Sequence, residues 1–204
     1  MKSVPIKKDS NYTITITGLG SNGEGVGRVD GFTVFVPYAL PDEQAEILVH
    51  TIKKNYAIGK IVRIIKASPQ RITPRCGLYY ECGGCQLQHL SYEAQLNRKR
   101  QQVIDALERI GGQKNLSVHA TLGAQNPWNY RNKMQFPVGR DKKKILIGCF
   151  AQGSHQIIDT RNCYIQKELN NDIVNTVRDI VQKLGISIYD EDRHLGTLRH
   201  IVGR

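Results

Sequence analysis

Three cysteines lie within ten residues of one another in the stretch RCGLYYECGGCQLQH, and they constrain the fold more than any other feature of this chain. Cys76, Cys82 and Cys85 have the spacing C-x5-C-G-G-C, and Cys163 lies far downstream. A centre that takes three thiols from one loop and a fourth from a distant segment joins separate parts of the chain. The sequence therefore predicts a fold that closes around a metal site.

The metal in such a site is predicted from the spacing of the thiols. A three-plus-one arrangement is typical of 4Fe-4S clusters, and glycines such as Gly83 and Gly84 let the backbone approach the sulfur atoms closely. Zinc sites usually have two C-x2-C knuckles, whereas this chain has one. Zinc and a metal-free thiol cluster are the alternatives to iron and sulfur. The fifth cysteine, Cys149, lies in an apolar run and is interpreted as a buried structural thiol.

The first third of the chain predicts a small β-barrel. Residues 12–17 alternate strictly between polar and apolar, and further short strands are predicted at 32–36, 45–52 and 56–65. About five strands in so short a stretch must close on themselves to bury their apolar faces, and we expect an OB-like barrel over residues 1–66.

Residues 18–23 within this region match the dinucleotide-binding pattern G-x-G-x-x-G, and Asp42 follows at the expected distance. That pattern binds a pyrophosphate only where a helix begins directly after the glycines. Gly25, Gly27 and a β-rich run follow here, so no helix can start. We interpret the motif as a β-turn or bulge.

The remainder, residues 75–204, predicts an α+β domain that follows a linker at 67–74. A helix capped by Ser91 ends at Gly111, and its outer face of Arg98, Lys99 and Arg100 is interpreted as solvated, with phosphate contact as the alternative. Strands at 128–138 and 145–150 are joined by a basic hairpin tip at 139–144. A second helix carries one apolar stripe and ends at Gly185, and we expect helices to cover one face of a mostly antiparallel sheet. The stripe comprises Leu169, Ile173, Val174, Val177, Ile180, Val181 and Leu184.

The formal net charge of +11 is distributed along the chain, with +3 in residues 1–66, +3 in 67–115 and +5 in 116–204. A distributed positive charge suits an extended polyanion, nucleic acid above all, although a soluble basic protein without such a partner is the alternative. No signal peptide and no segment of membrane-spanning length is predicted. We therefore expect a cytoplasmic monomer with no membrane partner, in which clustered cysteines bind metal rather than form disulfides.

The glycine-rich barrel resembles the N-terminal half of the RNA uracil-5-methyltransferase family, as do the segments CGLYYECGGCQLQHLSYEAQL, YRNKMQFPVG and GCFAQGSHQIIDTRNCYIQ. The resemblance is closest to bacterial iron–sulfur members that modify ribosomal RNA. It implies a TRAM barrel at 1–66 and an iron–sulfur central domain at 75–204, with Cys76, Cys82, Cys85 and Cys163 as ligands of a 4Fe-4S cluster. It also implies that Arg131 and Lys133, on an RNA-facing strand, contact RNA.

In that family a C-terminal domain binds S-adenosylmethionine and supplies a cysteine that adds to carbon 6 of the target uracil. The present chain ends at TLRHIVGR without a segment similar to that domain. The resemblance therefore implies the RNA-recognition and iron–sulfur part of an enzyme, which we expect to be inactive by itself, with S-adenosylmethionine bound only by the full-length parent. In this reading Lys and Arg would neutralise phosphates, and aromatic residues such as Tyr12, Phe32, Tyr56 or Trp128 would stack on unpaired bases. The alternatives are a stand-alone RNA-binding module with a structural metal site and a redox sensor.

Overall fold

The computed structural model describes residues 5–142 and 144–204, so residues 1–4 and Lys143 of the predicted hairpin tip lie outside the described part. The chain divides into two compact units, Met1–Thr73 with Gln86–Ala120 and Pro74–Cys85 with Thr121–Arg204. This division differs from the predicted domains 1–66 and 75–204, because the segment after the cysteine loop belongs with the first unit. The chain passes from one unit to the other three times.

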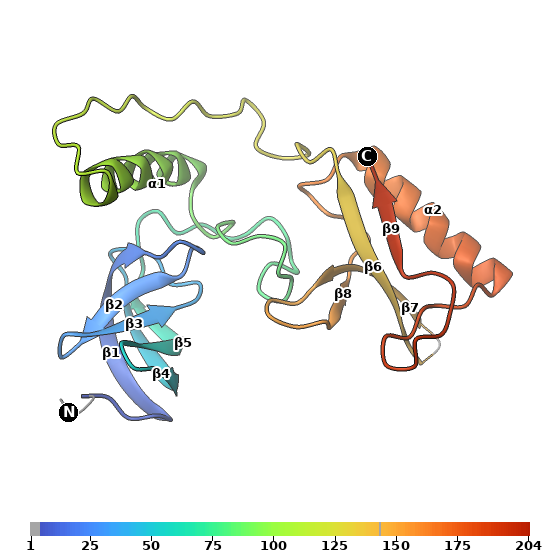
Figure 1. The fold of residues 1–204 in the computed structure, drawn as a ribbon, viewed down its shortest axis with the longest axis horizontal. Helices are drawn as coiled ribbons and strands as arrows, with labels where there is room; N and C mark the ends of the chain where they lie inside the picture. The colour runs from blue at the N-terminus through green and yellow to red at the C-terminus, as the bar shows by residue number, and fades with distance from the viewer. Residues whose placement is uncertain (1–4, 143) are drawn as a thin grey trace. The chain divides into compact units, whose positions relative to one another are not determined.

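The first unit contains a closed five-stranded barrel with the strand order β1-β2-β3-β5-β4 (Figure 1). The strands are β1 (Ser10–Leu19), β2 (Gly25–Val29), β3 (Phe32–Val36), β4 (Gln44–Ile52) and β5 (Tyr56–Lys66). β3 and β5 pair in parallel, and the other neighbours are antiparallel. Alternate residues such as Ile14, Ile16, Val34 and Val36 fill the interior, which confirms the predicted OB-like barrel.

The glycine motif forms the connection between β1 and β2. β1 ends at Leu19, a turn follows, and the pairing register of the two strands shifts between Ile16 and Gly18. Gly23 has a φ of +86°, which favours glycine, and the Asn22 amide donates to the Glu24 carboxylate at 3.0 Å. The prediction of a turn with a bulge is confirmed, and no helix starts here.

The predicted linker packs on the barrel instead of spanning open space. Glu43 is fully buried, and the Arg71 guanidinium donates to both of its carboxylate oxygens at 2.5 and 2.8 Å. The Ile72 amide donates to the carbonyl of His89 at 2.9 Å, and the Ser91 amide donates to that of Gln70 at 2.9 Å. The two segments on either side of the cysteine loop are thus bonded to each other within the first unit.

Helix α1 (Tyr92–Asp105) begins at Ser91, whose hydroxyl accepts a bond from the Ala94 amide, as predicted. It continues as one turn of π-helix, η1 (Ala106–Ile110), and ends at Gly111. The interpretation of Arg98 as part of a solvated face is wrong. Its side chain is half-buried and donates to the Leu19 carbonyl at the end of β1, so this arginine attaches the helix to the barrel.

The second unit contains an antiparallel sheet with the strand order β8-β7-β6-β9 and a helix, α2 (Glu168–Leu184), which lies along it in Figure 1. The strands are β6 (Met134–Asp141), β7 (Lys144–Phe150), β8 (Ile157–Asp159) and β9 (His200–Gly203). Val174 and Val181 of α2 pack with Met134, Phe136 and Ile147 of the sheet. The predicted helix-on-sheet arrangement is present in this unit.

The apolar stripe of α2 does not all face the sheet. Leu169 and Leu184 are 66% and 67% exposed, and Ile173 and Ile180 are more than 40% exposed. The inward face includes Arg178 instead, which is 4% exposed. Its guanidinium donates to the Asp159 carboxylate at 2.7 Å and to the carbonyls of Ile145, Ile147 and Thr160 at 2.9–3.3 Å.

No helix among residues 5–142 and 144–204 is both long and apolar enough to cross a bilayer.

Candidate functional site

The cysteine loop is attached to the end of strand β7 within the second unit. Cys82 forms an isolated bridge with Ala151, and the Gly83 amide donates to the Phe150 carbonyl at 2.9 Å. A Cβ at Gly83 would approach that carbonyl to 2.9 Å, so glycine is required for this close contact. The loop is thereby held against the strand that carries Cys149.

Cys82 and Cys149 form a hydrogen-bonded thiol pair. The hydrogen bond from the Cys149 thiol, helped by the Gly84 amide at 3.4 Å and opposed by burial, lowers the pKa of Cys82 to about 6. The same hydrogen bond, together with burial, raises the pKa of Cys149. Cys149, which the sequence treats as a spare structural thiol, therefore lies beside one of the predicted cluster ligands.

Cys76 and Cys163 lie near this pair. Burial raises the pKa of the Cys76 thiol, and the charges of Cys82 and Cys163 raise it further, so these sulfur atoms are close enough to interact electrostatically. The Asn171 side chain fixes the backbone of Cys163, accepting from its amide at 3.0 Å and donating to its carbonyl at 3.3 Å. Cys85, the remaining predicted ligand, is half-buried in the same loop.

The donor chemistry of these residues fits a centre bound by sulfur. The five cysteines are free thiols, the pKa of Cys82 is lowered to about 6, and a backbone amide donates to its sulfur atom. Within the described residues, however, no three His, Cys, Asp or Glu side chains are arranged as a ready group of metal ligands. The assignment of Cys76, Cys82, Cys85 and Cys163 as a ligand set stays a prediction.

The two predicted RNA contacts precede the strand on which they were expected. β6 begins at Met134, whereas Arg131 forms an isolated bridge with Gln166, and its amide donates to the Ile165 carbonyl at 2.9 Å. The side chains of Arg131 and Lys133 are exposed. The expected strand over 128–138 therefore starts too early, because the backbone groups of its first residues bond to the segment before α2.

Two of the aromatic side chains proposed as stacking platforms belong to the barrel core. Tyr12 and Phe32 pack against its buried residues, whereas Tyr56 is 37% exposed and meets the edge of Phe35. Trp128 lies in the second unit under the guanidinium of Arg75, 5.2 Å from its ring centroid.

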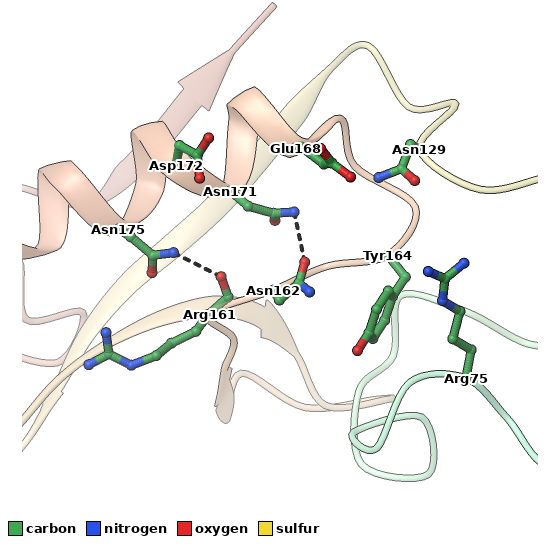
Figure 2. Close-up of a pocket in the computed structure, with 9 residues that line it drawn as sticks. All are labelled: Arg75, Asn129, Arg161, Asn162, Tyr164, Glu168, Asn171, Asp172 and Asn175. Carbon is green, nitrogen blue, oxygen red and sulfur yellow. Dashed lines mark hydrogen bonds between the residues drawn. The ribbon is translucent and has the colours of Figure 1, made fainter.

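A polar pocket in the second unit was not predicted from the sequence. It has a volume of about 360 Å³ and lies between the first turns of α2, the loop around Cys163 and the start of the cysteine loop (Figure 2). Its lining residues come from stretches that are distant in the sequence, and the asparagines near Cys163, most of which follow it, were the only signal in the sequence. The lining residues are Arg75, Asn129, Arg161, Asn162, Tyr164, Glu168, Asn171, Asp172 and Asn175.

Comparisons with known proteins identify a TRAM domain in the chain at residues 7–62, which coincides with the barrel. The chain is homologous to proteins described as uncharacterized RNA methyltransferases. It is 48% identical to one from Clostridium tetani and 44% identical to one from Halalkalibacterium halodurans, in each case over 100% of this chain and 44% of the relative. The chain thus spans less than half the length of these relatives.

Among solved structures, the chain is similar in fold to the tRNA (uracil-54, C5)-methyltransferase of Pyrococcus abyssi in complex with S-adenosyl-L-homocysteine. The match has a TM-score of 0.61 and 24% identity, and it covers 93% of this chain and 42% of that one. The present chain therefore shares the fold of less than half of that protein.

Proposed function

We propose that this chain is the RNA-recognition and 4Fe-4S portion of an S-adenosylmethionine-dependent RNA uracil-5-methyltransferase. The observation that carries the proposal is the coincidence of a TRAM barrel at residues 7–62 with homology to RNA methyltransferases along the full chain. The net charge of +11 supports an RNA partner. The chain would act as a monomeric module that binds the substrate RNA, while another part of the enzyme transfers the methyl group.

The RNA class has two candidates. The sequence motifs favour ribosomal RNA, whereas the solved enzyme of similar fold modifies a transfer RNA. Binding of the purified chain to fragments of both RNA classes, measured by filter retention, distinguishes them. S-adenosylmethionine would supply the methyl group in the full-length enzyme, and we assign no residue of this chain to hold it. The chain mixed with labelled S-adenosylmethionine and either RNA should transfer no methyl group.

RNA binding should depend strongly on salt, because Lys and Arg displace counterions from the phosphates. We expect the affinity to fall by at least about tenfold between low and physiological salt. Lys133→Gln should weaken binding and reduce the salt slope, whereas Lys183→Gln, a matched loss of charge in the last turn of α2, should change neither. Undetectable binding, or binding independent of ionic strength, would contradict the proposal.

The cluster proposal assigns Cys76, Cys82, Cys85 and Cys163 as ligands, so that one centre joins the cysteine loop to the segment before α2. When bound, the cluster would stabilise the folded second unit, because it links two segments that are distant in the sequence. Its support is the clustering of sulfur donors around Cys82 and Cys149. No part of the methyl transfer is assigned to it.

Anaerobic purification followed by iron and sulfide analysis tests this assignment. We expect about four irons and four sulfides per chain and a brown colour, both lost in Cys163→Ser and retained in Cys149→Ser. The two variants remove one thiol each, so they are a matched pair. A cluster that survives in Cys163→Ser and disappears in Cys149→Ser would assign the fourth ligand to Cys149. Zinc in place of iron would overturn the cluster itself.

A further inference from the structure

The pocket before α2 has the chemistry of a site for a polar ligand. Sites for drug-like molecules of similar volume are mostly apolar. This one is lined instead by four asparagines, two arginines, two carboxylates and one tyrosine. The charges of the arginines and the carboxylates balance, so the pocket is suited to a ligand with both hydrogen-bond donors and acceptors rather than to a bare polyanion.

Arg75 is held in this pocket by aromatic rings. Its guanidinium lies 4.8 Å from the ring centroid of Tyr164 and 5.2 Å from that of Trp128. No carboxylate in the described part of the chain forms an ion pair with it. An arginine oriented by stacking keeps its N–H groups available, and these groups match a phosphate in geometry. Figure 2 shows Arg75 beside Tyr164 at one end of the pocket.

The asparagines form a partly satisfied row along the pocket. Asn171 donates to the Asn162 side chain at 2.9 Å, and Asn175 donates to the Arg161 carbonyl at 3.0 Å, as Figure 2 shows. The Oδ1 atom of Asn175 is buried, and no donor in the described residues reaches it. An unpaired buried acceptor costs free energy, so the hydrogen bonding of this row is incomplete within the described residues.

We propose that this pocket binds one unpaired ribonucleotide of the substrate RNA. Arg75 contacts its phosphate, the Tyr164 side chain and the asparagine row contact its base, and Glu168 or Asp172 accepts from a ribose hydroxyl. Single-stranded RNA is recognised by this combination of stacking, base-edge hydrogen bonds and 2′-hydroxyl contacts. The proposal rests on the proposed RNA-binding function and adds the site and the state of the bound nucleotide.

Two arginine variants of the full chain test the site. Arg75→Ala and Arg199→Ala each remove one positive charge from the second unit. The first also removes two cation–π contacts and the second removes one, since Arg199 lies 5.1 Å from the Tyr189 ring. We measure binding of a short fluorescent single-stranded uridine-rich RNA by anisotropy. Arg75→Ala should weaken binding by about tenfold, the effect of losing one charge-assisted contact to the phosphate, and Arg199→Ala by less than about twofold. Iron content and thermal unfolding of both variants check that neither effect comes from the cluster or from misfolding.

A ring exchange and a cross-link provide independent readouts. Tyr164→Phe should retain most of the affinity, and Tyr164→Leu should lose as much as Arg75→Ala. RNA that contains 4-thiouridine should cross-link on irradiation to a peptide with Tyr164 or Trp128, and DNA of the same sequence should bind more weakly. If wild-type protein binds this RNA and the two arginine variants bind alike, the pocket proposal is overturned while the proposed function stands. If wild-type protein binds no RNA, the proposed function itself fails.

Discussion

The side chain of Arg178 joins α2 to the sheet of the second unit. It is buried and donates to the Asp159 carboxylate and to three carbonyls. The pKa of Asp159 is lowered: burial would raise it, but bonds from Lys144, the Ile147 amide and Arg178 outweigh burial. Sequence periodicity cannot assign such a residue to the core, because an arginine in an amphipathic helix normally marks the solvated face.

Replacing Arg178 should destabilise the second unit. Arg178→Met removes one buried donor from the Asp159 carboxylate and from three carbonyls, and we expect the free energy of unfolding to fall by about 3 kcal/mol. Urea unfolding followed by hydrogen exchange of the β7 amides measures this change. Arg193→Met, at an exposed loop position, should alter it by less than about 0.5 kcal/mol. Equal effects of the two substitutions would mean that the network around Arg178 contributes no net stability.

The part of the first unit that precedes helix α1 contains a buried polar side chain, that of His89. His89 is fully buried against the edge of Tyr38. Burial, followed by the charge of Arg71 and opposed by that of Glu43, lowers the pKa of His89 from 6.5 to about 4. For Glu43, burial raises the pKa, but the bonds from Arg71, Leu40 and Ser68 outweigh it and the net shift is downward. The motif CGGCQLQH therefore has two parts, of which the cysteines belong to the second unit and His89 to the first.

The first unit should lose stability in acid. Below a pH of about 6.5, His89 binds a proton in the unfolded chain but stays neutral in the folded chain. The free energy of unfolding of the first unit therefore falls as the pH drops toward about 4. The loss reaches about 3 kcal/mol, and protonation of Glu43 adds to it at lower pH. Chemical unfolding across this pH range, monitored by the α1 amides, measures the slope. It should disappear over pH 4–6.5 in His89→Phe and persist in His50→Gln, whose parent histidine is exposed.

For the molecule as a whole, the features that depend only on neighbouring residues could be predicted from the sequence. Alternation in the first strands predicts the barrel, and Ser91 and Gly185 mark a start and an end of helices, because strand period and helix caps need only neighbouring residues. The division of the chain could not be predicted in this way. It depends on Arg71, Leu90 and Arg98 packing against a barrel that ends before them.

The two candidate sites also differ in how far they could be predicted from the sequence. The cysteine spacing predicts a metal centre because three thiols are close in the sequence. The contact of Cys82 with Cys149 depends on the bridge between the loop and Ala151, which follows β7, and the sequence does not indicate it. The pocket takes residues from three separate stretches, each of which resembles an ordinary polar loop or the polar face of a helix by itself. Tertiary contacts between distant polar residues leave no period in a sequence, so geometry was needed to find them.

The interleaved order of the two units has a consequence for synthesis on the ribosome. The loop Pro74–Cys85 is translated before the rest of its own unit, which begins at Thr121, and well before Cys149 and Cys163. Meanwhile the barrel and its helix can finish folding as soon as Ala120 has emerged. The thiols of the nascent loop therefore stay exposed until Cys149 and Cys163 have been synthesised. During this time both ends of the loop are joined to a folded domain.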